Sequence, residues 1–165
     1  MLKSRLNKFE IVLFSPQIPQ NTGNIGRLCV NTNSTLHLIK PLGFSLDEKY
    51  IKRAGMDYWN YVDLHVYENW NAFASLKNRD SFFFFSTKTD KSFWDCSYSS
   101  NEKDETVYLI FGNENKGLSP DIYRDYTDRL YTIPMFGEHA RSYNLANSVA
   151  IVLFEGLRRY IQGRE

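Results

Sequence analysis

The chain has 165 residues, enough for one domain with a sizeable hydrophobic core, and its formal net charge is +1. Hydrophobic residues make up 42% and aromatic residues 16% of the chain, which argues against a disordered protein. The small net charge excludes a general polycation, so any contact with nucleic acid must use a local basic face.

The cysteine content and the apolar runs restrict the class of protein further. Cys29 and Cys96 cannot form a disulfide framework, and no Cys/His spacing typical of a metal site occurs. We therefore expect a reduced, cytoplasmic protein without a structural metal. The apolar run at residues 11–14 is too short for a signal sequence or a membrane-spanning helix, so no membrane association is expected.

In the first half of the chain, short apolar runs predict strands, and apolar residues at helical spacing predict helices. Strands are expected at residues 11–14, 36–39 and 62–67. Helices are expected at residues 24–31, 46–53 and 70–76, and residues 15–23 between the first strand and helix are rich in turn formers.

The second half continues this alternation, with strands expected at 81–85, 106–111 and 129–133 and a helix from 142 to about 161. The runs 81–85 and 106–111 are typical of central parallel strands that are covered on both faces. We therefore predict a single α/β domain over residues 1–165, with a mostly parallel sheet flanked by helices. Ligand sites in such sheets lie beyond the carboxyl ends of the strands.

The first polar segment at such a position contains Asn21, Gly23 and Arg27. Its glycines and small amides suit a tight strand-to-helix turn with exposed backbone N–H groups. The helical spacing places Arg27 opposite the apolar face of the helix, so its side chain should point away from the core. An ordinary helix cap followed by a surface arginine is the alternative.

The second segment follows the strand predicted at 106–111 and has the G-x-x-x-x-G spacing in Gly112 and Gly117. A phosphate-binding loop of an NTPase then needs a lysine, but Leu118 follows, and Glu114 within the loop would repel phosphate. Two interpretations stay open. Gly112 can let a ligand approach the backbone, or the segment is a plain turn with a surface Glu–Lys pair.

The third segment precedes the last helix and contains Ser142 and Asn144. We expect the Ser142 hydroxyl to cap this helix and Asn144 to lie near its first turn, where free N–H groups can face a ligand. Simple capping is the alternative. The three histidines share no motif with a nucleophile, so a catalytic triad is not supported.

Together and in this order, the three segments resemble the motifs N-x-G-x-x-x-R, G-x-E-x-x-G and S-x-N-L of SPOUT-class RNA methyltransferases. The resemblance covers about residues 11–159. Within the class, the chain looks most like the minimal, single-domain tRNA (cytidine/uridine-34 2′-O)-methyltransferases. The residues that carry the match are Asn21, Gly23, Arg27, Gly112, Glu114, Gly117, Ser142, Asn144 and Leu145.

The resemblance implies transfer of a methyl group from S-adenosylmethionine to the ribose 2′-hydroxyl of the tRNA wobble nucleotide. It also implies a C-terminal trefoil knot and an obligate homodimer that completes each active site. Arg27 would lie nearest the hydroxyl, as a general base or, because its pKa above about 12 keeps it protonated, as an electrostatic stabiliser. The other catalytic residues would be Asn21, Glu114, Ser142 and Asn144.

By the same resemblance, S-adenosylmethionine would contact Phe85, Gly112, Ile133, Met135, Ser142 and Leu145. The partner RNA would be the anticodon stem-loop, whose splayed bases are read as single-stranded RNA. We expect its phosphates to contact basic residues in loops and helix ends. These candidates are Lys52, Arg53, Lys88, Lys91, Lys116 and Arg141.

The chain departs from the family pattern in and after the second motif, where the stretch at residues 137–139 is slightly long and several residues differ. Asn113 stands where proline is usual, Asn115-Lys116 where a Thr/Ser–Arg pair is common, and Ala146 where serine is frequent. Three alternatives therefore stay open: methylation of another tRNA or rRNA ribose, a non-catalytic RNA-binding module, and a flavodoxin-like domain. The last explains the α/β pattern but none of the three motifs.

Overall fold

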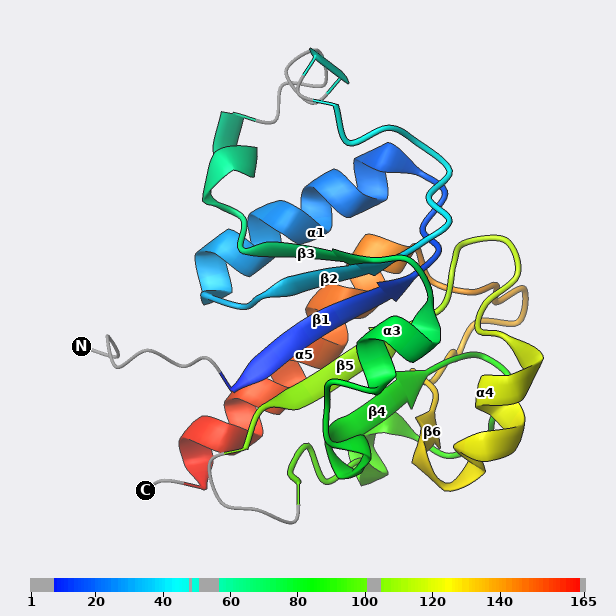
Figure 1. Cartoon of the computed structure of the whole chain (residues 1–165). Coiled ribbons are helices and arrows are strands. Elements are labelled where there is room, and N and C mark those ends of the chain that lie inside the picture. Colours follow the sequence, from blue (N-terminus) through cyan, green and yellow to red (C-terminus); the bar gives the residue numbers. More distant parts are fainter. Residues whose placement is uncertain (1–7, 48, 51–56, 101–104, 164–165) are drawn as a thin grey trace.

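The computed structural model describes residues 8–47, 49–50, 57–100 and 105–163 and shows a six-stranded sheet with helices on both faces (Figure 1). The strand order is β3-β2-β1-β5-β4-β6, and the described strands pair with one another only in parallel. The strands are β1 Phe9–Phe14, β2 Leu36–Ile39, β3 Leu64–Tyr67, β4 Phe82–Phe85, β5 Val107–Phe111 and β6 Leu130–Tyr131. The predicted α/β class and parallel sheet are confirmed.

The four labelled helices are α1 Pro19–Thr32, α3 Trp70–Ala74, α4 Pro120–Asp125 and α5 Leu145–Gln162. Short 3₁₀ segments are η1 Asp57–Tyr61, η2 Arg79–Ser81, η3 Phe93–Asp95 and η4 Thr127–Arg129. Half of the helix predicted at 46–53, including Lys52 and Arg53, lies outside the described residues. The passage of the chain through a trefoil knot stays a prediction.

The start of α1 differs from the prediction, which placed residues 15–23 in a turn. The helix begins at Pro19, whose fixed φ and missing N–H suit the first turn of a helix. Asn21 and Gly23 therefore lie inside the helix instead of in a strand-to-helix loop. The helix ends at Thr32 and is capped by Asn33, which adopts a left-handed conformation with φ 55°.

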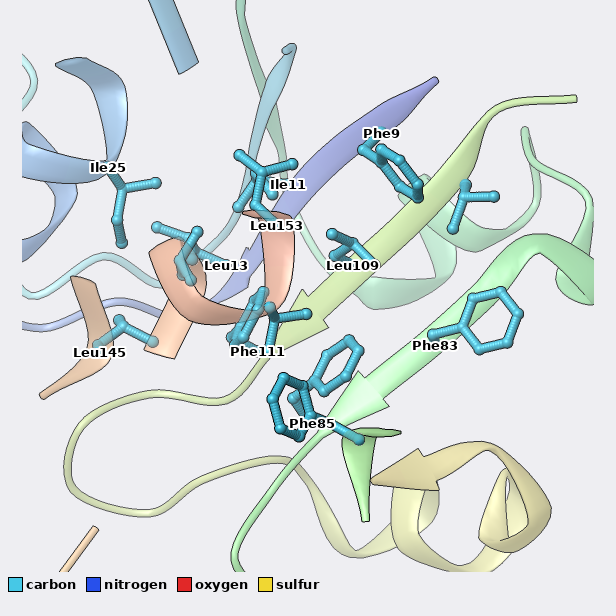
Figure 2. Close-up of a cluster of buried hydrophobic side chains, with 14 of the residues drawn as sticks. Phe9, Ile11, Leu13, Ile25, Phe83, Phe85, Leu109, Phe111, Leu145 and Leu153 are labelled. Atoms are coloured by element: carbon cyan, nitrogen blue, oxygen red, sulfur yellow. The ribbon is translucent and has the colours of Figure 1, made fainter. Parts of the chain in front are cut away.

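The core lies on both faces of the sheet, because β4 and β5 are buried along their whole length. One apolar cluster fills the space between the sheet and helices α1 and α5, and Figure 2 shows Ile25 and Leu153 of these helices against strand residues. A second cluster, with Phe73 of α3 and Ile122 of α4, covers the opposite face. Phe85 and Phe111 stack with ring centres 5.2 Å apart at the carboxyl ends of their strands, as Figure 2 also shows.

Among the described residues, none of the helices combines the length and the apolar character that crossing a membrane requires. Both cysteines are buried and free. Burial raises the pKa of each thiol to about 12, which keeps both in the neutral form at physiological pH. Cys29 and Cys96 are therefore core residues and not reactive thiols.

Candidate active site

A cavity of about 610 Å³ opens beyond the carboxyl ends of β4, β5 and β6, where a parallel sheet places its ligand sites. Its walls come from the start of α1, the segments after β4 and β5, and the segment between β6 and α5. The three motif segments thus meet at one place, although 123 residues separate Asn21 from Asn144. The predicted site residues that line the cavity are Asn21, Phe85, Lys88, Gly112, Glu114, Lys116, Ile133, Ser142, Asn144 and Leu145.

Glu114 connects the second motif to the first. One of its carboxylate oxygens accepts a hydrogen bond from the backbone N–H of Gln17 at 2.9 Å. The other accepts from the backbone N–H of Ile18 and from the Asn21 side-chain amide, each at 3.1 Å. A negative charge at this end of α1 is also favoured by the helix dipole.

The environment of Glu114 keeps its carboxyl group ionised. Partial burial by itself would raise the pKa, but the hydrogen bonds from Gln17, Asn21 and Ile18 outweigh burial, and the pKa is lowered from its ordinary value. The side chain is therefore an acceptor for these donors at physiological pH. The alternative of a plain turn with a surface Glu–Lys pair is wrong, because Glu114 bonds to α1 and its preceding loop.

Asn144 connects the third motif to the first. Its amide nitrogen donates to the side-chain oxygen of Asn21 at 2.9 Å. Its own oxygen accepts from the backbone N–H groups of Ala146 at 2.9 Å and Asn147 at 3.4 Å, which makes Asn144 the cap of α5. The prediction that Ser142 caps this helix is wrong, because Ser142 lies two residues too early for its hydroxyl to reach the first free N–H groups.

The loop after β5 is shaped by its two glycines and by Asn113. Asn113 and Gly117 exchange two backbone hydrogen bonds, each 3.1 Å long, so that the loop closes on itself. A side chain at Gly112 would collide with the backbone of Gly117 and Leu118, and Gly117 has a φ of +71° that favours glycine. The Asn113 side chain accepts from the N–H groups of Asn115 and Lys116, which gives this departure from the family pattern a structural role.

Residues without a motif complete the cavity wall. The Tyr123 hydroxyl lies 2.9 Å from the Ser86 hydroxyl and accepts a hydrogen bond from the backbone N–H of Leu118 at 3.2 Å. The Lys88 ammonium group lies 5.0 Å from the centre of the Tyr123 ring. Tyr143 donates its hydroxyl proton to the Pro134 carbonyl at 3.0 Å and so ties together the two ends of the segment that forms one wall. Sequence analysis missed Tyr123 and Tyr143.

Arg27 is the principal site residue that the cavity does not contain. It lies exposed on the outer face of α1, as its helical spacing predicts. Its guanidinium carbon lies 5.2 Å from the centre of the Tyr58 ring. The other predicted catalytic residues, Asn21, Glu114, Ser142 and Asn144, all line the cavity, whereas Arg27 lies outside it.

Three further predicted residues also lie outside the cavity lining, namely Met135, Arg141 and Lys91. Met135 and Arg141 are exposed on the segment between β6 and α5. Lys91 donates hydrogen bonds to the Asp128 carbonyl at 3.1 Å and to the Tyr131 hydroxyl at 3.2 Å. Lys91 therefore holds β6 in place, and Lys88 and Lys116 are the predicted lysines that line the cavity among the described residues.

The sequence and the fold were compared with known proteins. The model of the SpoU rRNA Methylase family matches residues 8–154. A protein from Geobacillus stearothermophilus that is assigned as a tRNA (cytidine(34)-2′-O)-methyltransferase is 43% identical over 149 residues. The match covers 90% of this chain and 93% of that protein.

Solved structures give the same result. A Bacillus anthracis protein assigned as an RNA methyltransferase has a solved structure that matches this one with a TM-score of 0.83 and 40% sequence identity. The match covers 92% of this chain and 93% of the Bacillus anthracis chain. A structure from work on 2-OH methylation of C/U34 on tRNA has a TM-score of 0.80 and 36% identity, with coverage of 94% and 97%. The chain therefore belongs to the SpoU methylase family, as the three motifs predict, and is a methyltransferase.

Proposed function

We propose that this protein methylates the ribose 2′-hydroxyl of nucleotide 34, a cytidine or uridine, in the tRNA anticodon, with S-adenosylmethionine as methyl donor and in the cytoplasm. The observation that carries the proposal is the convergence of the three motif segments on one cavity at the carboxyl edge of the sheet. The relatives that share this architecture over nine-tenths of the chain carry the same activity in their names.

The cavity fits the proposed donor in size and in chemistry. Its volume of about 610 Å³ is within the range of about 300–1,000 Å³ that is common for small-molecule sites. Apolar surface from Phe85, Ile133 and Leu145 suits an adenine ring, and the loop at Gly112 suits close approach to the backbone. When bound, S-adenosylmethionine supplies an electrophilic methyl group.

The protein's own residues then have three tasks. Glu114 and Asn144, through their bonds to Asn21, fix the start of α1 against the cavity. Arg27 offers a cation that stabilises negative charge as it develops on the 2′-oxygen and that binds the adjacent phosphate. Lys88 and Lys116 line the cavity, and Arg141 directly precedes Ser142 of its wall. These three basic side chains contact RNA phosphates.

A homodimer would bring Arg27 to a cavity. Because the arginine is exposed and outside the cavity of its own chain, a second copy can present it to the site. Helix α5 also has an uncovered face with two large apolar side chains, Ile151 with 38% and Phe154 with 57% of its surface exposed. Side chains of this size at positions i and i+3 form one stripe, which suits contact with a second copy.

The direct test of the proposed function uses a synthetic anticodon stem-loop and labelled S-adenosylmethionine. We expect label in the RNA that has a ribose at nucleotide 34 and none in the same RNA with 2′-deoxyribose at that nucleotide. Equal labelling of the two RNAs would contradict methylation at this hydroxyl. Equal labelling of unrelated RNAs would contradict recognition of the anticodon.

The dimeric site is tested by co-expressing two strongly impaired variants, Arg27→Ala and Gly112→Ala. If Arg27 acts on the partner's cavity, a mixed dimer contains one complete site, and random mixing restores about a quarter of wild-type activity. If Arg27 acts within its own chain, the mixed dimer contains no complete site and stays inactive. An inactive mixture that nevertheless contains mixed dimers would contradict the shared site.

A further inference from the structure

The 3₁₀ segment η1 packs against the outer side of α1, close to Arg27. The Trp59 ring lies so near Gly26 that a Cβ added there would be 2.7 Å from a ring carbon. The neighbouring Tyr58 donates its hydroxyl proton to the Gly23 carbonyl at 2.7 Å. Two consecutive aromatic side chains thus fix η1 to one turn of α1, and that turn ends at Arg27.

The Tyr58 ring is held in the place where it contacts Arg27. Gly23 lies one helical turn before Arg27, so the hydroxyl bond anchors the ring on the face of α1 that carries the arginine. The guanidinium carbon lies 5.2 Å from the ring centre, within the distance for a cation–π interaction. Burial raises the pKa of Tyr58, and the nearby positive charge of Arg27 acts in the opposite direction.

The ring contact leaves the polar edge of the arginine available. A guanidinium that lies over an aromatic face keeps its in-plane N–H groups directed outward, where they can bond to a phosphate or a ribose oxygen. Within the described ranges, the Arg27 side chain forms no ion pair with a carboxylate. Tyr58 therefore restrains the side chain without neutralising its charge or occupying its donors.

We infer that Tyr58 is a positioning residue for Arg27, which it holds extended and charged for the methyl transfer, an inference that rests on the proposed function. Arginine has many rotamers in solution, and ordering it before RNA binds lowers the entropy that is lost in the transition state. Tyr58 does not line the cavity, so it should affect turnover and not the binding of the methyl donor.

The first test compares Tyr58→Leu, Tyr58→Phe and the wild-type enzyme with tRNA as substrate. For Tyr58→Leu we expect kcat to fall by about tenfold, because misplacement of a reacting group is costly, while KM for S-adenosylmethionine stays unchanged. Tyr58→Phe keeps the ring but loses the hydroxyl bond to Gly23, so it should retain clearly more activity than Tyr58→Leu. Equal losses in both variants, or a raised KM for the donor, would contradict positioning through the ring.

A double-mutant cycle separates positioning from a general structural role. If Tyr58 acts through Arg27, then Tyr58→Leu should cause no further loss in the residual activity of a chain that already carries Arg27→Ala, measured in single-turnover reactions with excess enzyme. An additional tenfold loss would show that Tyr58 acts by another route. The matched control is Tyr61→Leu, because Tyr61 belongs to the same segment η1 but has 78% of its surface exposed, and it should leave kcat unchanged.

The rate of chemical modification of Arg27 tests the inference without any methyl transfer. Phenylglyoxal modifies arginine, and peptide mass spectrometry gives the rate at Arg27 without turnover. We expect Tyr58→Leu to raise this rate several-fold, because the ring no longer covers one face of the guanidinium, and an unchanged rate would contradict the inference. Failure of the wild-type enzyme to methylate nucleotide 34 would contradict the proposed function alone.

Discussion

At Gly112, the loop after β5 folds back so closely that the backbone leaves no room for a side chain. An added Cβ would lie 2.5 Å from the Leu118 nitrogen and closer still to Gly117. We expect Gly112→Ala to distort the loop and weaken S-adenosylmethionine binding by at least about tenfold, as isothermal titration calorimetry can measure.

The control for this substitution is Gly137→Ala, in the segment between β6 and α5. A Cβ there would find its nearest neighbour, the Ala140 nitrogen, at 3.9 Å, which is an ordinary contact. This variant should bind the donor as tightly as the wild type. Equal weakening in both variants would mean that crowding at Gly112 is not the cause.

The contribution of Glu114 to the free energy of unfolding should depend on pH. Glu114→Gln replaces a charged acceptor of three N–H groups, and we expect the free energy of unfolding at neutral pH to fall by about 1 kcal/mol, since the side chain is only partly buried. Because folding lowers the pKa of Glu114, its contribution is present above the ordinary value of 4.5 and is lost as pH falls through the folded-state pKa.

Urea unfolding of wild type and Glu114→Gln, well above and well below pH 4.5, measures this contribution. The difference in stability should shrink in acid, because the wild-type carboxyl becomes protonated and the amide does not change. A difference that stays constant or grows with acidity would contradict an ionised Glu114 in the folded protein.

Chemistry at the residue scale could be predicted from the sequence only where a motif exists. Asn21, Glu114 and Asn144 were predicted to act together, and the structure joins them in one chain of hydrogen bonds. The Asp57-Tyr58 pair supports the family resemblance, but neither its contact with Arg27 nor the role of Tyr123 could be predicted, because a tyrosine next to a motif residue in space can lie anywhere in the sequence. Their roles depend on tertiary packing that periodicity does not encode.

At the scale of elements, the cap of α5 is tested by comparing the stability of Asn144→Ala with that of Ser142→Ala. Asn144→Ala removes two bonds to the first turn of α5 and the bond to Asn21, so we expect a loss of about 1–2 kcal/mol in the free energy of unfolding. Ser142→Ala should cost less than about 0.5 kcal/mol, because Ser142 is exposed and is not the cap. Chemical denaturation measures both, and the opposite ranking would restore Ser142 as the cap.

The strands could be predicted well because each is a short apolar run between turn formers, and β2 was predicted with its observed bounds. The start of α1 was not, because Pro16, Pro19 and Gly23 favour turns in isolation, whereas the helix uses Pro19 in its first turn. Helix α4 was missed because six residues are too few to show helical periodicity.

At the scale of the whole molecule, sequence patterns predicted a parallel sheet but not its order. In the observed order, β1 lies between β2 and β5, and β5 lies between β1 and β4. Apolar periodicity shows that a strand is buried but not which strand lies beside it, so the order requires the structure. The meeting of the three motifs followed only from the rule that ligand sites lie beyond the carboxyl ends of strands.

The proposed dimer depends on the uncovered face of α5. Phe154→Glu would place a charge within the proposed interface, so we expect a monomer by sedimentation analysis, with loss of methyl transfer and unchanged circular dichroism. Leu76→Glu is the control, because Leu76 has 70% of its surface exposed but lies after α3, on the opposite face of the sheet. A fully active Phe154→Glu monomer would contradict a shared active site.

The most direct measurement is methyl transfer from labelled S-adenosylmethionine to total tRNA from a strain that lacks this protein, followed by nuclease mapping of the product. We expect a 2′-O-methyl group at nucleotide 34 with the wild-type enzyme and its loss with Arg27→Ala. Label at another ribose would contradict the proposed position, and undiminished label with Arg27→Ala would contradict the role of the arginine.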